Sequence, residues 1–412
     1  MSARARWLAL LASVVVVVEA SSWVALRVLG ERRGLRYRTY DGLIEPWRPQ
    51  MEEIVAADGT WYQRIDPELG WITIPGATTD DAAITASGIR AARDYAATPP
   101  PGVVRIAAFG DSFVHGDEVA TGETWTAALE RALPRVEVLN YGVGGYGLDQ
   151  ALLRYEREGA RMAPHVVLVG VITDDVLRGV NVFRPFFAPT TGHVLTKPRF
   201  LLDDAGRLEL LRNPLPGVDA YRAFLADPVP KLREIVRHDD YAPPVSDAGP
   251  LDALASVRLV KLLTATLRRS GDGERQIRRG ELNLDAEPSR LALAVLHRFV
   301  ERVRANGAEP LIVIFPDRTE LDARRDGRAI SYRPLRDRLR DEGIPVVDVL
   351  DGFDALAPDW TTEKVLRRSH YAPWGNELVA GFLAQQLVAR QLVPAPPAGV
   401  PVDAATPAPV AP

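Results

Sequence analysis

The chain has 412 residues, 47% of them apolar and 25% charged, so it can bury a sizeable core in two or three average domains or in one enlarged domain. Lys and Arg total 50 against 54 for Asp and Glu, a net charge of −4 without any basic run, which excludes the electrostatic pattern of a nucleic-acid-binding protein. Cysteine is absent, which excludes disulfides, thiol catalysis and thiolate metal sites, and the six histidines form no metal-binding pair, so we expect no metal and no cofactor.

Residues 1–30 have the features of a membrane segment. Two arginines precede an apolar run over 7–18, which has the length of a signal-peptide core. Read on through Glu19 to Leu29, the segment is long enough for an uncleaved anchor, although a carboxylate in lipid is costly. We expect a single-pass cell-membrane anchor with the bulk of the protein outside the cytoplasm, or a secreted protein if cleavage follows Ala20.

The remainder is expected to hold one enlarged α/β domain. Residues 31–102 are interpreted as an irregular lead-in, and residues 103–392 as the domain, in which β-branched runs alternate with amphipathic stretches. This alternation predicts a parallel sheet with helices on both faces. The alternation lapses over about 176–288, interpreted as an insertion with a hairpin at 197–211, and the Pro/Ala-rich residues 393–412 are expected to be a disordered tail. The predicted strands are 103–109, 136–140, 165–172, 309–315 and 344–350.

Four short clusters follow the predicted strands or precede the last helix. They are Gly110-Asp111-Ser112-Phe113, the turn from Asn140 to Gly147, Thr173-Asp174-Asp175, and the segment around His370. Because ligands bind beyond the carboxyl ends of parallel strands, we expect these clusters to lie together. A hydroxyl, a glycine-rich turn, a polar side chain and a histidine are the parts that acyl transfer needs: a nucleophile, oxyanion donors and a base.

In this order the clusters resemble the sequence blocks of the SGNH (GDSL) hydrolase superfamily, over residues 103–390. The resemblance implies a flavodoxin-like three-layer sandwich with a central parallel sheet. It implies that Ser112 is the nucleophile, that His370 is the base, and that Ser112, Gly145 and the residue at Asp174 form the oxyanion hole. The implied function is an extracytoplasmic serine esterase that cleaves carboxylic (O-acyl) esters of a glycan, a lipid or a small molecule through an acyl-enzyme.

Two positions depart from the family's pattern. Asp174 stands where the family has an asparagine that donates to the oxyanion, and an ionised carboxylate can only accept. The family's acid lies two or three residues before the histidine, where this chain has Arg367 and Arg368. We therefore expect either a substitute carboxylate or a Ser–His dyad; the candidates by proximity in sequence are Glu363, Asp359 and Asp354.

These departures leave other functions open. One is an O-acyltransferase of an envelope polysaccharide that uses the same residues, and another is a catalytically silent glycan-binding or scaffold protein. Residues 142–147 also satisfy the G-x-G-x-x-G pattern of dinucleotide-binding proteins, but here the pattern follows the second predicted strand, whereas it normally follows the first. We therefore favour the esterase.

Overall fold

The computed structural model describes residues 2–79, 81–190, 192–270 and 275–395. It divides into two compact units. The sheet unit comprises Thr60–Val182, Thr196–Pro216 and Arg275–Pro412, and the helical unit comprises Met1–Gly59, Phe183–Leu195 and Gly217–Glu274. The expected insertion at 176–288 is therefore shared between the two units.

The sheet unit is built on a five-stranded parallel sheet in the order β11-β10-β5-β3-β4. The strands lie where the apolar runs predict them, because a parallel strand covered on both faces consists almost entirely of buried residues. The order is that of flavodoxin-like folds, and it changes direction between β3 and β5, where such folds form their ligand crevice. The strands are β3 (Val104–Phe109), β4 (Val136–Asn140), β5 (Val166–Val171), β10 (Glu309–Ile314) and β11 (Val346–Asp348).

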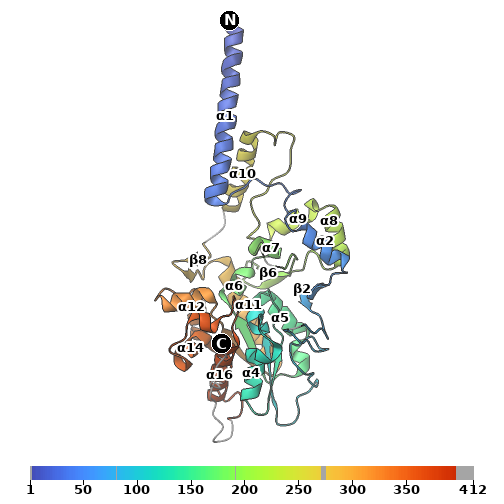
Figure 1. Ribbon diagram of the computed structural model, residues 1–412, viewed down its shortest axis with the longest axis vertical. Coiled ribbons are helices and arrows are strands. Elements are labelled where there is room, and N and C mark those ends of the chain that lie inside the picture. Colours follow the sequence, from blue (N-terminus) through green and yellow to red (C-terminus); the bar gives the residue numbers. More distant parts are fainter. Residues whose placement is uncertain (1, 80, 191, 271–274, 396–412) are drawn as a thin grey trace, which may run out of the picture. The chain divides into compact units, whose positions relative to one another are not determined.

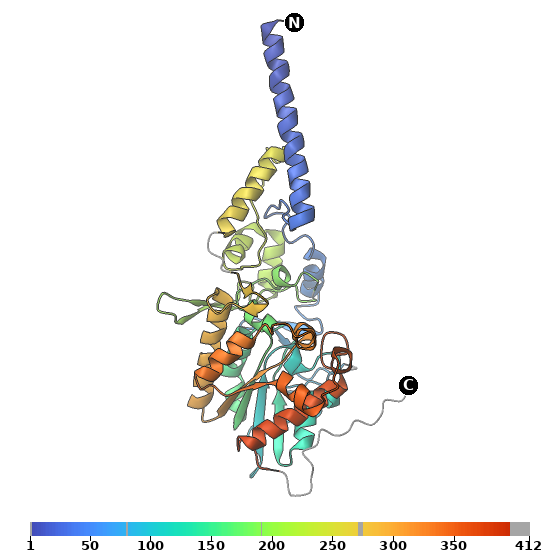
Figure 2. The ribbon, with the colours of Figure 1, turned by 90° about the vertical axis from the view of Figure 1, so that its left-hand side faces the viewer.

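Two groups of helices flank this sheet and complete the three-layer sandwich (Figure 2). In one group α16 (Pro373–Ala389) packs on α4 (Trp125–Ala132) and α14 (Val349–Leu356), and in the other α11 (Glu287–Ala305) packs on α5 (Leu148–Arg157). The predicted fold class, an α/β sandwich with a central parallel sheet, is confirmed. The other helices described in the sheet unit are α3 (Ser112–His115), η1 (Thr121–Glu123), η2 (Gly159–Met162), α6 (Thr173–Arg178), α12 (Arg318–Arg325), α13 (Arg333–Asp341) and α15 (Thr362–Val365).

The segment from 31 to 102 is more ordered than expected. It contains α2 (Arg48–Ala56) and an antiparallel pair, β1 (Gln63–Asp66) and β2 (Gly70–Thr73). Asp66 Oδ1 closes the turn between these strands by accepting the N–H groups of Glu68 and Leu69 at 3.0 and 2.8 Å. Strands of four residues are too short to show a clear alternation of polar and apolar residues, which is why the sequence suggested irregular structure.

The expected insertion forms regular elements in both units. In the sheet unit, β6 (Arg199–Leu202) and β7 (Leu208–Leu211) form the predicted hairpin, followed later by the short pair β8 (Ile277–Arg278) and β9 (Glu281–Leu282). The helical unit contains α7 (Arg184–Phe187), α8 (Val218–Ala226), α9 (Val229–Arg237) and α10 (Ala255–Ser270). Of the predicted Pro/Ala-rich tail, residues 396–412 lie outside the described residues.

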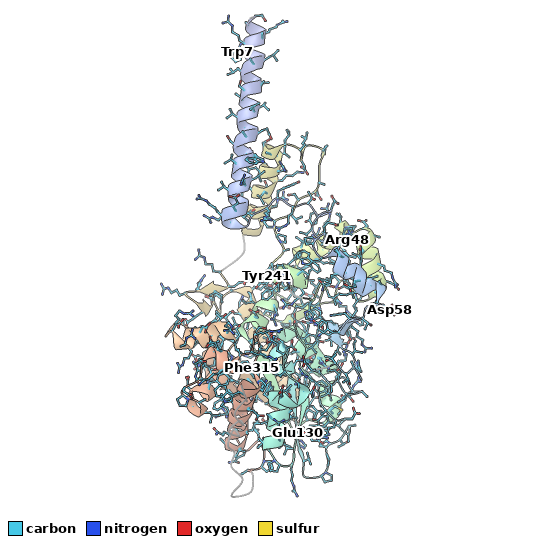
Figure 3. All side chains as sticks on the ribbon, in the orientation of Figure 1. Trp7, Arg48, Asp58, Glu130, Tyr241 and Phe315 are labelled. Carbon is cyan, nitrogen blue, oxygen red and sulfur yellow. The ribbon has the colours of Figure 1, made fainter. Side chains whose placement is uncertain are left out.

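The helical unit begins with α1 (Ala3–Arg33), a helix of 31 residues that contains a stretch of 18 residues with mean hydropathy 2.1. Its apolar side chains project outward along its length, as Figure 3 shows from the labelled Trp7 onward, and Trp7 itself is 70% exposed. The helix is long and apolar enough to cross a membrane, and a signal sequence would have the same features.

Candidate active site

Ser112 follows the carboxyl end of β3, the strand between β5 and β4, and is the first residue of α3. Asp111 caps this helix, because its Oδ1 accepts the N–H of Phe113 at 2.9 Å. Gly110 is needed before it, since a Cβ at this position would lie 2.5 Å from Val114 Cγ2. The turn therefore fixes Ser112 at the edge of the sheet, where its side chain is largely buried.

The structure brings His370 to Ser112 although 258 residues separate them. His370 Nε2 lies 2.8 Å from Ser112 Oγ, within the range for a nucleophile and its base. The histidine precedes α16 in a short turn held by the bridge between Leu366 and Tyr371. This geometry is the one that the sequence analysis requires of the two residues.

Glu118, six residues after Ser112, is the candidate for the acid that the family's pattern places before the histidine. Its Oε1 lies 3.0 Å from His370 Nδ1 and accepts the Ser369 hydroxyl at 2.8 Å. Its Oε2 accepts the backbone N–H groups of Arg368 and Ser369 at 3.1 and 3.4 Å. The segment that carries arginines in place of the family's acid thus binds a carboxylate from another loop.

The backbone and charge of Glu118 both support this assignment. Its φ of 70° is unusual for a residue other than glycine, and such strain is typical of functional sites. Partial burial tends to raise the pKa of Glu118, but the hydrogen bonds from His370 and Ser369 outweigh this and hold that pKa below its ordinary value. Glu118 is therefore a carboxylate at neutral pH.

The carboxylates considered from the sequence do not contact His370 among the described interactions. Asp354 binds Arg324 and Trp360, Asp359 binds Lys364, and Glu363 is exposed in the first turn of α15. Proximity in sequence was misleading, because the loop after β3 and the turn before α16 meet at the same edge of the sheet. The signal available in the sequence was a carboxylate shortly after Ser112.

The glycine-rich turn after β4 is hydrogen-bonded to α3, the helix that begins with Ser112. Asn140 Nδ2 donates to Val114 O at 2.8 Å, and its Oδ1 accepts the Gly142 N–H at 2.9 Å. Gly142 allows the turn to approach α3, because a Cβ there would lie 2.2 Å from His115 N. In a dinucleotide-binding turn the glycine backbone approaches a pyrophosphate closely; in this protein the same turn approaches α3 instead. Gly145 adopts a φ of 80°, which favours glycine.

Asp174, at the position of the family's asparagine, is paired with a cation. Its side chain is 43% exposed, and its Oδ2 lies 3.4 Å from Arg178 Nη2. Arg178 Nη1 also lies 2.9 Å from Asp175 Oδ1 and 3.4 Å from Asp111 Oδ2. One guanidinium therefore contacts both the cluster that holds Ser112 and the cluster that holds Asp174. Burial raises the pKa of Asp111 and, together with the Asp111 charge, that of Asp175. The cation offsets the negative charge that Asp174 brings to this edge.

A further carboxyl pair lies at the same edge of the sheet, after β10. Asp317 caps α12 by accepting the Thr319 N–H, and Glu320 accepts the hydroxyl of Thr173 at 2.9 Å. Desolvation and the neighbouring Glu320 raise the pKa of Asp317 to about 8. Asp317, whose neighbour Glu320 contacts Thr173, therefore keeps its proton near neutral pH.

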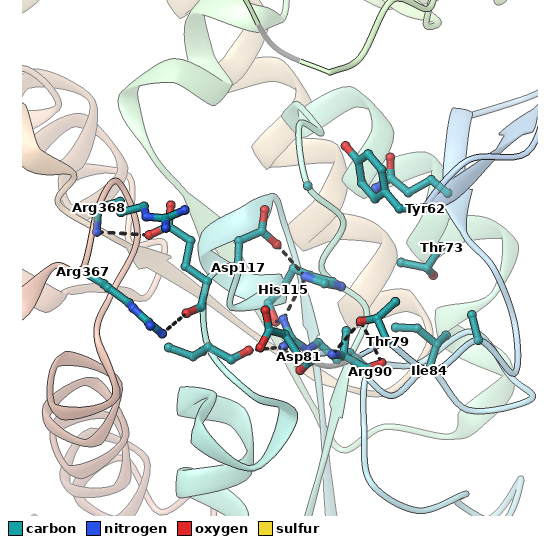
Figure 4. A pocket seen from close by; sticks show the side chains of 16 residues that line it. Tyr62, Thr73, Thr79, Asp81, Ile84, Arg90, His115, Asp117, Arg367 and Arg368 are labelled. Carbon is teal, nitrogen blue, oxygen red and sulfur yellow. Dashed lines mark hydrogen bonds and ion pairs between the residues drawn. The ribbon is translucent and has the colours of Figure 1, made fainter. Parts of the chain in front are cut away.

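A pocket of about 480 Å³ adjoins the site within the sheet unit (Figure 4). Glu118 and Gly144 belong to both, and Arg367 and Arg368 line its side nearest α16. Next to them His115 Nδ1 lies 2.7 Å from Asp117 Oδ1. The pocket is lined by Tyr62, Gln63, Thr73, Ala77, Thr79, Asp81, Ala82, Ile84, Arg90, His115, Asp117, Glu118, Val119, Gly144, Arg367 and Arg368.

Comparison with known proteins agrees with this geometry. The model of the GDSL-like Lipase/Acylhydrolase family matches residues 108–378, which is more than half of the chain and includes Ser112, Glu118 and His370. The chain belongs to this GDSL-like family. A comparison with curated proteins finds no match.

Several solved structures are similar to this GDSL-family chain at low identity. A member of the lipolytic G-D-S-L family from Veillonella parvula is 14% identical, with 70% of this chain and 100% of that chain covered and a TM-score of 0.32. A GDSL-like lipase from Bacteroides thetaiotaomicron is 10% identical, with 69% and 88% covered and a TM-score of 0.33. A catalytic mutant of an acetylxylan esterase from Geobacillus stearothermophilus is 12% identical, with 71% and 96% covered and a TM-score of 0.35.

Proposed function

We propose that this GDSL-family protein is a serine esterase that uses Ser112, His370 and Glu118 as a catalytic triad on carboxylic O-acyl esters. The observation that carries the proposal is the continuous chain of hydrogen-bond contacts from Ser112 Oγ to His370 Nε2 at 2.8 Å and from His370 Nδ1 to Glu118 Oε1 at 3.0 Å. A complete triad weakens the case for a catalytically silent protein.

The chemistry follows from the position of each group. Ser112 Oγ attacks the ester carbonyl as His370 Nε2 takes its proton, and Glu118 stabilises the imidazolium that forms. The tetrahedral intermediate collapses by breaking the bond to the alcohol oxygen, which leaves with the proton from His370. Water then attacks the acyl-enzyme, again giving a proton to His370, and the second collapse releases the carboxylic acid and restores the Ser112 hydroxyl.

We assign stabilisation of the oxyanion to backbone N–H groups at and near Ser112. The N–H groups of Ser112 and Gly145 are the proposed donors, and the positive φ of Gly145 sets the direction of the second one. Asp174 cannot donate a hydrogen bond as a carboxylate, and we propose that the positive charge of Arg178 offsets its negative charge. This hole has one donor fewer than the family's pattern provides.

The pocket supports an ester whose alcohol part is polar. A volume of about 480 Å³ is of the size that holds a small-molecule ligand, and the guanidinium, hydroxyl and carboxylate groups around it suit a hydroxyl-rich molecule such as an acylated sugar. The apolar helix α1 supports a membrane-anchored protein with the catalytic domain outside the cytoplasm. An O-acylated envelope glycan would meet both conditions.

The proposal is tested by hydrolysis of p-nitrophenyl acetate and of an acetylated monosaccharide by the full-length chain in detergent. We expect turnover by the wild type and its loss in Ser112→Ala and His370→Ala. Activity that survives Ser112→Ala contradicts the nucleophile assignment. Adding a free polyol distinguishes the transferase, because a transferase partitions the acetyl group to the added hydroxyl instead of to water.

A further inference from the structure

Glu19, the carboxylate in the middle of the apolar helix α1, binds the beginning of α10. Its Oε2 accepts the backbone N–H groups of Ala255 at 2.6 Å and Ser256 at 3.4 Å, and its Oε1 accepts the Ser256 hydroxyl. These N–H groups are among those that the first turn of a helix leaves without an intrahelical acceptor. Glu19 therefore acts as a cap for α10 from 236 residues away.

Helix α10 lies against α1 and shows apolar side chains on its opposite side. Figures 1 and 2 show α10 beside the half of α1 that follows Glu19, and the two helices belong to the same unit. Val260, Leu263 and Leu267, spaced by three and four residues, form one stripe and are 63%, 43% and 72% exposed. Leu251 and Leu254, just before the helix, are exposed as well. We call these five residues the α10 stripe.

The length of α1 places Glu19 inside a bilayer that the helix crosses. The apolar run 7–18 rises about 18 Å, whereas a hydrocarbon core is about 30 Å thick and takes about 20 helical residues. A full span therefore continues through Glu19 into the half of α1 beside which α10 lies. An unpaired carboxylate there would be costly, and its contacts with the start of α10 satisfy it.

We propose that α10 and the turn before it lie in the outer leaflet beside α1, with the α10 stripe in contact with phospholipid acyl chains. We infer that lipid covers the α10 stripe because α10 packs on α1 within one unit, and α1 is the helix that is long and apolar enough to cross a membrane. Five of the eight large apolar side chains exposed outside α1, among the described residues, belong to this stripe. Arg268 lies in the last turn of α10, where its positive charge suits lipid headgroups.

The proposal rests on the proposed membrane anchor and excludes cleavage after Ala20, which would separate Glu19 from α10. It makes the anchor a two-segment structure in which the helical unit, and not a single helix, meets the lipid. The Glu19 contact then restricts the movement of α10 relative to α1.

The absence of cysteine permits a direct test by single-cysteine labelling. The full chain is reconstituted in phosphatidylcholine vesicles as Leu263→Cys and Leu267→Cys, with Val16→Cys in α1 as the membrane control and Asp359→Cys, whose side chain is 83% exposed, as the water control. We expect the two α10 cysteines to react with a membrane-impermeant maleimide at least about tenfold more slowly than Asp359→Cys, because lipid disfavours the reactive thiolate.

Each outcome decides between explanations. Slow labelling of all three apolar sites, with an intact N-terminus by mass spectrometry, supports the proposal. Slow labelling of Val16→Cys alone overturns the position of α10 but keeps the anchor, whereas fast labelling of Val16→Cys overturns both. Protection that disappears when the protein is diluted in lipid indicates a contact between copies of the chain and also overturns the proposal.

Discussion

Replacing Glu118 by glutamine separates a triad from a Ser–His dyad. Glutamine keeps the size of the side chain and an oxygen for His370 Nδ1 but removes the negative charge. With charge centres about 4 Å apart and an effective dielectric of about 20 for a partly exposed pair, the carboxylate stabilises the imidazolium by about 4 kcal/mol. At 1.36 kcal/mol for each tenfold change, Glu118→Gln should lower kcat by about 10³.

The assay is steady-state hydrolysis of p-nitrophenyl acetate, with the fold checked by circular dichroism. Glu363→Gln is the matched control, because Glu363 is exposed and was a candidate for the acid by proximity in sequence. Its kcat should stay within about twofold of the wild type, as expected for a surface substitution. If Glu118→Gln keeps the wild-type kcat, or if Glu363→Gln loses it, the assignment of the acid is wrong.

Three further changes test neighbouring parts of the site. Gly145→Ala keeps the backbone N–H but strains it at a φ of 80°, so the N–H should turn away from the oxyanion and kcat should fall by about 10²–10³ if that N–H is a donor. An unchanged kcat contradicts this role for Gly145. Asp174→Asn supplies an amide donor and should raise kcat, whereas no change means that the side chain does not face the oxyanion. Because the pKa of Asp317 is raised from 3.8 to about 8, the folded state holds a proton that the unfolded state releases, so wild-type stability should fall as pH rises between these values, by up to about 1.4 kcal/mol per unit. Asp317→Asn should reduce the fall in stability between pH 5 and pH 8, measured by urea unfolding, although Asp111 and Asp175, whose pKa values are also raised, keep part of it. An unaltered fall would contradict the raised pKa of Asp317.

The sequence was most informative where local pattern determines structure. Buried parallel strands are nearly continuous apolar runs, so all five strands of the sheet could be located, and the rule that sites form at their carboxyl ends placed Ser112 and His370 together. Contacts between distant loops carry no such pattern. The pairing of Glu118 with His370 spans 252 residues, and that of Glu19 with α10 spans 236.

The two missed contacts concern the charged residues that were hardest to explain from the sequence. Arg367 and Arg368 appeared to remove the triad acid, yet the backbone around them holds Glu118 in that position. Glu19 appeared to interrupt a membrane helix, yet it caps another helix. In both cases a charged residue departs from the pattern expected of its local sequence, and its partner is distant in sequence and can be found only from the fold.

The role of Ser112 as the nucleophile is tested most directly by identifying the residue that reacts with a serine-directed fluorophosphonate in the full-length chain. We expect one adduct per chain, located on Ser112 by peptide mass spectrometry, absent from Ser112→Ala and much slower to form in His370→Ala. An adduct on another serine, or no adduct in a folded wild-type protein that hydrolyses esters, would contradict the role of Ser112.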